Sequence, residues 1–136
     1  MFKKILSAFS VSVLFSLLIF YYSAPVFKDY SDKFTIYPSS SSTDKFETVN
    51  EKNFPLIKKG GESFEIKNGE ITVEEILVKY NAELIFTESI EEGISYYAYS
   101  SGIPYVKTIN GKKINLHIFI GKEKTVVGSP LIFGSF

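Results

Sequence analysis

An uncharged apolar run near the N-terminus limits what this chain can fold into more than any other feature. After Lys3 and Lys4, the run Ile5–Tyr22 spans 18 residues without a charge. As a helix it would be roughly 27 Å long, close to the hydrocarbon thickness of a bilayer. Because lysines precede the run and tyrosines close it, residues 5–22 are predicted to contact the membrane as an anchor. This predicts a single-pass protein of the cell membrane with a cytoplasmic N-terminus and an extracytoplasmic C-terminal domain.

A cleaved secretory signal is the alternative reading of residues 1–22, and it would make the protein secreted. A charged start followed by an apolar core is common to signals and anchors. Cleavage after Ala24 would place the bulky Tyr22 three positions before the cut and Pro25 directly after it. That arrangement departs from the small-x-small pattern of cleavage sites, so the sequence favours the anchor.

The composition argues against a disulfide-stabilised protein and against a nucleic-acid-binding protein. The chain has no cysteine, so no disulfide framework can form and stability must come from a core. From Glu62 onward, seven lysines stand against ten glutamates, and arginine is absent throughout. Phosphate binding relies on a dense basic surface, so nucleic acid is not predicted as a partner.

Residues 23–61 are predicted to be an extracytoplasmic linker that precedes a folded domain at 62–136. Their apolar residues follow no steady period, and breakers are frequent. An alternative is that two short clusters, Phe34–Tyr37 and Phe54–Ile57, pack on the domain as strands. The breakers are Pro25, Pro38, Pro55, the serine run 39–42 and the Gly60–Gly61 pair.

The domain begins with a strand and one short helix. Thr72 with Glu75 three residues later forms a capping box, and Asn81 suits a left-handed C-terminal cap. Between them, apolar residues share one helix face; these are Val73, Ile76, Leu77 and Tyr80. A helix of about two turns needs a sheet beneath it.

The remaining segments alternate as β-strands do. Turn signals separate them, including Asn68–Gly69, Glu91–Gly93, Asn110–Gly111 and Lys122–Glu123. The expected fold class is therefore α+β: a two-layer sandwich of one helix on a four- or five-stranded antiparallel sheet. The four or five strands are expected after the helix, at 82–88, 94–100, 105–109, 113–120 and 125–133, and the segment 63–67 before the helix also alternates.

His117 is the only histidine in the chain and the first candidate for chemistry. Along its strand it alternates with isoleucines and falls opposite Pro104 or Gly128, depending on which turn sets the register. Neither residue can orient an imidazole as a general base. We therefore expect an exposed or locally bonded strand histidine, with a small cell-envelope hydrolase using His117 as the alternative function.

No catalytic motif survives a search of the sequence. Gly93–Tyr97 lacks the second glycine of a nucleophile elbow, and the adjacent pairs Glu74–Glu75 and Glu91–Glu92 diverge. One histidine with distant carboxylates gives no readable metal spacing. The protein is therefore predicted not to be an enzyme, with no cofactor and no metal.

Aromatic residues on one strand face are the remaining candidates for function. Tyr97 and Tyr99 share a face, and with Phe119 they are predicted to form an apolar binding patch. The alternative is that the linker or the C-terminal residues 133–136 cover this patch. The sequence thus predicts a membrane-anchored extracytoplasmic binding module whose partner is an envelope protein or a second copy of the chain.

Three stretches carry a resemblance to a known family. They are YYAYSSGIPY at 96–105, NGKKINLHI at 110–118 and VVGSPLIF at 126–133. The segment from Thr72 to Phe136 resembles the YwmB family of small exported proteins from spore-forming Firmicutes. The resemblance implies a fold similar to one half of the TATA-box-binding protein, and an association with sporulation or the cell envelope. It transfers no functional residues, and this chain is shorter than the family's members.

Overall fold

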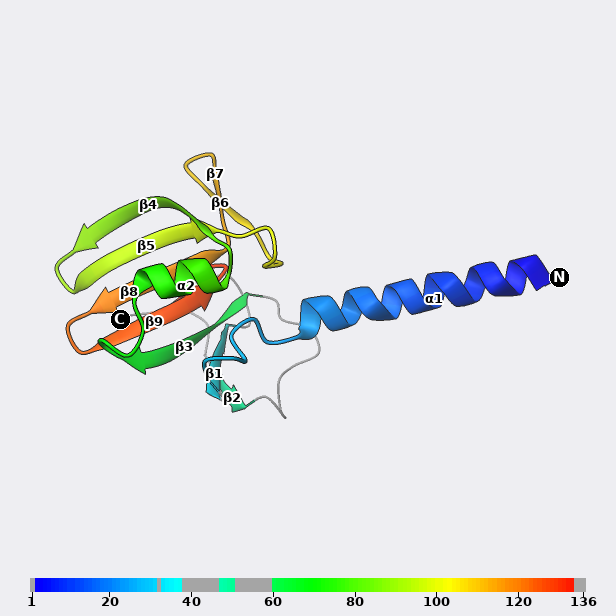
Figure 1. Cartoon of the computed structure of the whole chain (residues 1–136), viewed down its shortest axis with the longest axis horizontal. Helices are drawn as coiled ribbons and strands as arrows, with labels where there is room; N and C mark the ends of the chain where they lie inside the picture. The colour runs from blue at the N-terminus through cyan, green and yellow to red at the C-terminus, as the bar shows by residue number, and fades with distance from the viewer. Residues whose placement is uncertain (1, 32, 38–46, 51–59, 134–136) are drawn as a thin grey trace.

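The structure is a computed structural model that describes residues 2–31, 33–37, 47–50 and 60–133. Two helices and nine strands make up this part of the chain (Figure 1). The helices are α1 (Phe2–Ser23) and α2 (Val73–Lys79). The strands are β1 (Lys33–Tyr37), β2 (Glu47–Asn50), β3 (Gly61–Lys67), β4 (Glu83–Ile90), β5 (Gly93–Tyr99), β6 (Lys107–Ile109), β7 (Lys112–Ile114), β8 (Leu116–Gly121) and β9 (Lys124–Ser129).

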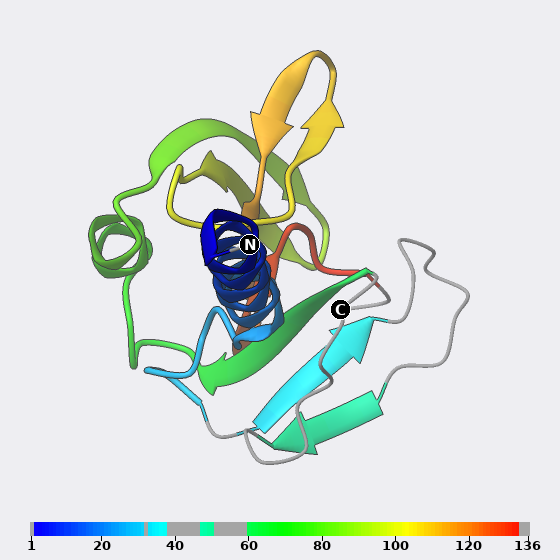
Figure 2. The same ribbon diagram turned by 90° about the vertical axis from the view of Figure 1, so that its right-hand side faces the viewer.

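Seven strands form one antiparallel sheet in the order β2-β1-β3-β9-β8-β5-β4. The short β6 and β7 form a separate hairpin, which stands out from the end of the sheet near β4 and β5 (Figure 1). Figure 2 shows β2 and β1 at the far side of the sheet from that hairpin.

The predicted sheet of four or five strands is wrong. Two of the seven strands, β1 and β2, come from the segment that was predicted to be a linker. The alternative of a short strand at Phe34–Tyr37 matches β1, whereas Phe54–Ile57 lies outside the described residues. The prediction failed because β1 has only two inward apolar residues, Phe34 and Ile36, and is held by pairing with distant β3.

The predicted N-terminal membrane anchor is also contradicted. Within the described part of the chain, no helix is both long enough and apolar enough to cross a membrane. The prediction rested mainly on the absence of charged residues over 5–22, whereas a membrane span also has to be sufficiently apolar. The same finding contradicts the predicted membrane contact of residues 5–22 and the predicted single-pass location in the cell membrane. The alternative of a secreted protein stays a prediction.

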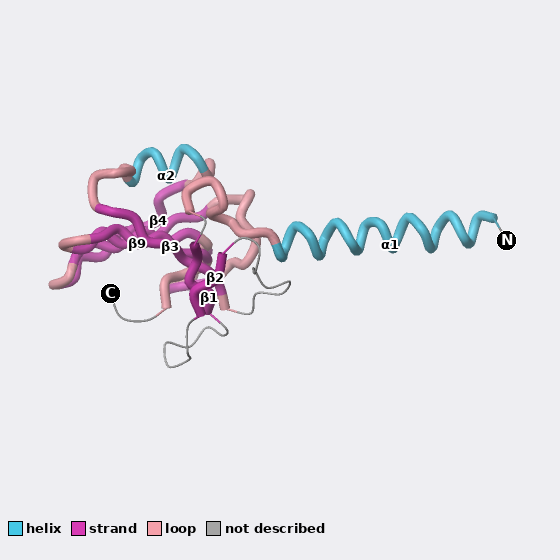
Figure 3. Tube along the Cα trace, turned by 90° about the horizontal axis from the view of Figure 1, so that it is seen from below, coloured by secondary structure: helices cyan, strands magenta, loops and turns pink. Residues whose placement is uncertain are grey.

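The first helix, α1, projects away from the rest of the molecule (Figure 1 and Figure 3). Its described side chains are exposed, including large apolar ones such as Phe9, Phe15 and Phe20. A hydrogen bond joins its C-terminal end to the domain: the Tyr21 hydroxyl donates to the Gly102 carbonyl oxygen at 3.2 Å.

The second helix, α2, covers one face of the sheet (Figure 3). The predicted capping box is confirmed: the Thr72 N–H donates to Glu75 Oε2 at 2.7 Å, and the Glu75 N–H donates to Thr72 Oγ1 at 3.2 Å. The Thr72 N–H and the Thr72 hydroxyl both donate to the Glu75 carboxylate, and these two hydrogen bonds hold the pKa of Glu75 below its ordinary value. Asn81 has φ +47°, as expected of a left-handed cap. Val73 and Ile76 are buried against the sheet.

The segment after α1 belongs to the core rather than to a free linker. Phe27 is fully buried, with its ring centroid 5.0 Å from that of Phe64 on β3 and 5.6 Å from that of Tyr80. The buried carboxylate of Glu62 accepts hydrogen bonds from the backbone N–H groups of Val26 and Phe27. This segment therefore closes the core between α2 and β3.

Asn115 separates β7 from β8 and fixes where the chain enters the main sheet. Its Oδ1 accepts from the Ser100 N–H at 2.8 Å. Its Nδ2 donates to the carbonyl oxygens of Ser100 at 2.6 Å and Ile103 at 2.8 Å. This buried amide ends the β6–β7 hairpin and starts β8 beside β5, which sets the register of the candidate site.

Candidate functional site

The sheet has two unlike faces. Alternate residues on the central strands point toward α2 and form the apolar core. The remaining residues form the opposite face, which we call the aromatic face. From β4 to β1 it carries Phe86, Glu88, Ser95, Tyr97, Tyr99, His117, Phe119, Val126, Gly128, Ser63, Glu65 and Tyr37.

Three aromatic rings stack across neighbouring strands of this face. Phe86, Tyr97 and His117 lie directly opposite one another on β4, β5 and β8. The centroids of Phe86 and Tyr97 are 4.4 Å apart with 19° between the ring planes. Those of Tyr97 and His117 are 4.4 Å apart with 17° between planes. We call this set the ring ladder; Lys112 Nζ lies 5.7 Å from the Phe86 centroid.

His117 is buried at the inner end of the ring ladder, with 3 % of its surface exposed. Its Nδ1 accepts a hydrogen bond from the Ile132 N–H at 3.2 Å. Burial lowers the pKa of His117 to about 4, because an imidazolium would lose its hydration there. The ring is therefore neutral at neutral pH and acts as an acceptor toward the backbone.

The register of His117 was predicted only in part. It lies opposite Gly128, as the turn at Lys122–Glu123 indicated, and not opposite Pro104. Its second neighbour is Tyr97, which the sequence did not indicate. The expected local bond is present, whereas the exposed alternative is wrong.

Tyr97, the first predicted site residue, lies in the middle of the ring ladder and is partly exposed. Its hydroxyl donates to Glu88 Oε2 at 3.2 Å. Partial burial raises the pKa of the Tyr97 phenol, so the hydroxyl stays protonated at neutral pH. Tyr97 is thus a partly exposed ring whose protonated hydroxyl bonds to Glu88.

Phe119, the second predicted residue, is 2 % exposed and forms part of the lining of a hollow of about 410 Å³. Gly121 leaves room for this ring, because a Cβ there would lie 3.0 Å from Phe119 Cε1. We call this space the Phe119 hollow. Its other lining residues are Glu92, Gly121, Lys122, Glu123 and Lys124.

Tyr99, the third predicted residue, lines a separate hollow of about 510 Å³, which we call the Tyr99 hollow. Lys112 contributes to this hollow and also lies over Phe86, so the hollow adjoins the ring ladder. The remaining lining residues are Glu83, Leu84, Ile85 and Lys113. The three predicted residues therefore do not form one patch: Tyr97 lies between two hollows, and the other two each line one.

The half of the aromatic face beyond His117 is covered by the C-terminal residues 131–133, which we call the C-terminal strap. The Ile132 side chain lies close to Gly128, where an added Cβ would be 2.7 Å from Ile132 Cγ1. Phe133 packs edge-on against Tyr37, with centroids 5.4 Å apart. The predicted alternative was that the linker or residues 133–136 cover the patch of Tyr97, Tyr99 and Phe119. Residues 134–136 lie outside the described residues, and the described contacts of the strap are with His117, Gly128 and Tyr37.

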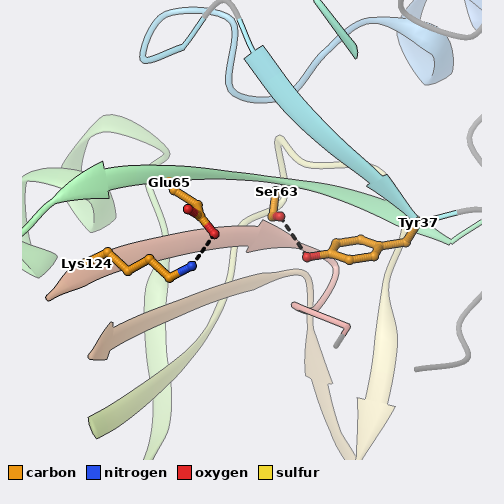
Figure 4. A network of polar contacts seen from close by, with 4 residues as sticks. All are labelled: Tyr37, Ser63, Glu65 and Lys124. Carbon is orange, nitrogen blue, oxygen red and sulfur yellow. Dashed lines mark hydrogen bonds and ion pairs between the residues drawn. The ribbon is translucent and has the colours of Figure 1, made fainter. Parts of the chain in front are cut away.

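Polar contacts tie the strands together under and beside the strap (Figure 4). The Tyr37 hydroxyl and Ser63 Oγ are 2.7 Å apart. Lys124 Nζ pairs with Glu65 Oε1 at 2.6 Å, and both side chains are about half exposed. Figure 4 shows that both contacts involve β3: one joins it to β1 and the other joins it to β9.

Within the described ranges, no group of three or more histidine, cysteine, aspartate or glutamate side chains could hold a metal ion. Comparison with known proteins adds no name to this site. No protein-family model, no curated protein and no solved structure matches the chain. The resemblance to the YwmB family stays a prediction, as does its suggested link to sporulation.

Proposed function

We propose that this protein is a binding module that holds an extended segment of another protein along β4 and β5 on the aromatic face. One observation carries the proposal: each end of β5 adjoins a hollow, and Phe119 and Tyr99, which line one hollow each, lie on the same face of the sheet as the ring ladder. Both volumes fall within the range of about 300–1,000 Å³ that is typical of ligand pockets.

The distance between the hollows suits a short extended segment. At about 3.4 Å per residue, the path along β5 from Gly93 to Tyr99 is roughly 20 Å long. An extended partner of about seven residues would cover it and could place one side chain in each hollow. The outer edge of β4 is the end of the sheet, which leaves this side open to an added chain within the described residues.

The lining residues indicate the chemistry of the partner. Leu84, Tyr99 and Phe119 favour apolar or aromatic side chains in the two hollows. At the Tyr99 hollow, Lys112 and Lys113 are opposed by one carboxylate, that of Glu83, which favours an acidic residue there. The partner is thus an extended segment with two apolar side chains and an acidic residue beside the second.

The test is a crosslinking pull-down with the full-length protein from cells that produce it. We compare wild type with Tyr97→Ser, with the double change Lys112→Glu and Lys113→Glu, and with Val78→Ser as the control. Val78 is 80 % exposed on α2, on the other side of the sheet.

We expect one protein to be captured by wild type and by Val78→Ser, and to be lost or strongly reduced with the other two variants. Equal capture by all four proteins would overturn the proposal. Capture of nothing but further copies of the chain would also overturn it, because the occupant would then be the protein itself.

A further inference from the structure

The C-terminal strap crosses the inner end of the ring ladder. After β9, the strap runs back over the aromatic face, and its Ile132 N–H donates to His117 Nδ1 at 3.2 Å. His117 is at the same time stacked on Tyr97, the central ring of the proposed binding path. One side chain therefore joins the open half of the face to the covered half.

The strap is held by few contacts besides this hydrogen bond. Ile132 packs over Gly128, and Phe133 packs edge-on against Tyr37, whose hydroxyl also bonds to the backbone of Phe133. The strap residues Leu131, Ile132 and Phe133 are only partly buried, whereas the β9 residue Val127 is fully buried. Segments with few buried contacts open at lower free energy than the sheet that they cover.

We propose that residues 131–133 are a displaceable strap that limits the binding path, and that protonation of His117 releases it. The effect of this release on the binding path rests on the proposed function. The release of the strap itself does not depend on it. A protonated imidazole carries hydrogens on both ring nitrogens, so Nδ1 can no longer accept from the Ile132 N–H. The hydrogen bond then becomes a contact between two donors.

Among the described residues, several groups face His117 from the elements packed against it. From β5 comes the phenol of Tyr97, whose hydroxyl bonds to Glu88 on β4. From β9 comes Gly128, and from the strap comes Ile132; neither residue has a titratable side chain. Farther along the face, Lys112 lies over Phe86, and the phenol of Tyr37 lies beside Phe133.

The direction of the pH effect follows from burial. Burial in the closed structure holds the pKa of His117 near 4, whereas an exposed histidine has a pKa of about 6.5. The strap is therefore fully favoured above pH 6.5 and loses stability as the pH falls toward 4. Between pH 7 and pH 4 its opening constant rises by roughly 100-fold, and the limit of about 300-fold is reached only well below pH 4.

The experiment measures amide hydrogen exchange by NMR on the full-length protein between pH 7 and pH 4, corrected for intrinsic exchange. We expect protection of the Ile132 amide to fall by about 100-fold. The Val127 amide in β9 serves as the internal control and stays protected. His117→Asn supplies an amide oxygen near the position of Nδ1 that does not titrate, so the pH dependence at Ile132 disappears.

A second variant tests the strap without a change of pH. An alanine at position 128 would collide with Ile132 Cγ1 at 2.7 Å and approach the Ile132 nitrogen at 3.1 Å. Gly128→Ala should therefore lower Ile132 protection at pH 7 by at least tenfold, with Val127 unchanged. Protection at Ile132 that is independent of pH in wild type, or that varies equally in His117→Asn, would overturn the proposal.

The two proposals fail separately. The exchange measurement needs no partner, so its result stands whatever the pull-down shows. If Ile132 opens as expected but Tyr97→Ser captures the same protein as wild type, the strap is retained and the binding path is rejected. If Tyr97→Ser loses the partner but Ile132 shows no pH dependence, the binding path is retained and the strap is rejected.

Discussion

On the side of the sheet toward α2, the side chains are apolar and enclosed: Leu116, Ile118 and Val127 are fully buried. On the aromatic face of the same strands, rings alternate with serine, glycine and histidine, and the surface has two hollows. Alternation along a strand puts both sets in one sequence but gives them different neighbours. The enclosed face therefore accounts for stability, and the partly open face is the place to look for binding.

The largest effect is expected on the enclosed face. Phe64 is 1 % exposed and its ring centroid lies 5.0 Å from that of Phe27. Phe64→Ala should lower the free energy of unfolding by about 3–5 kcal/mol, measured by urea denaturation, because it leaves a cavity between the sheet and the segment after α1. A loss of less than about 1 kcal/mol would show that this face is not the main core.

The next effect is expected at the residue that starts β8. Asn115→Ala removes the side-chain partners of the Ser100 N–H and of two carbonyl oxygens. Because these backbone groups would be buried without partners, we expect a loss of about 2–3 kcal/mol in the same assay. Asn115→Asp is the comparison variant: it keeps the acceptor for Ser100 but places a buried carboxylate oxygen against the two carbonyl oxygens, so at neutral pH it should lose at least as much as the alanine variant.

A smaller effect is expected on the open half of the aromatic face. Tyr97→Ser removes two ring contacts from a side chain that is only partly buried. We expect a loss of about 1–2 kcal/mol in thermal or urea unfolding. The protein should remain folded, so that lost binding by this variant reports on the surface. A loss as large as that of Phe64→Ala would erase the distinction between the faces.

The smallest effect is expected at the edge of the covered half. Lys124 and Glu65 form an ion pair at 2.6 Å, but both side chains are about half exposed. Lys124→Ala should change the free energy of unfolding by no more than about 0.5 kcal/mol, and less in high salt. A loss above about 2 kcal/mol would mean that this pair supports the strap side of the face.

Local features of the fold could be predicted from the sequence, because their causes are local. The capping box at Thr72 and Glu75, the left-handed Asn81 and the Asn110–Gly111 turn follow from the chemistry of neighbouring residues. In the turn, Asn110 and Gly111 both have positive φ, as their residue types favour.

Features that depend on distant pairing could not be predicted in this way. The strands β1 and β2 exist because β1 pairs with β3, and their own residues give too short a pattern to show it. The ring ladder depends on β8 lying between β5 and β9, which the break at Asn115 permits. Tyr97 was predicted from its spacing, whereas its partners Phe86 and His117 required the register of three strands.

The central claim is that the open aromatic face, and not the side of α2, contacts a partner. The most direct measurement places the photo-crosslinking amino acid p-benzoylphenylalanine at position 97 or, in a separate protein, at position 78, and irradiates cells that produce each one. We predict a covalent adduct with another protein from position 97 and none from position 78. Adducts of equal yield at the two positions, or an adduct at position 78 alone, would contradict the account.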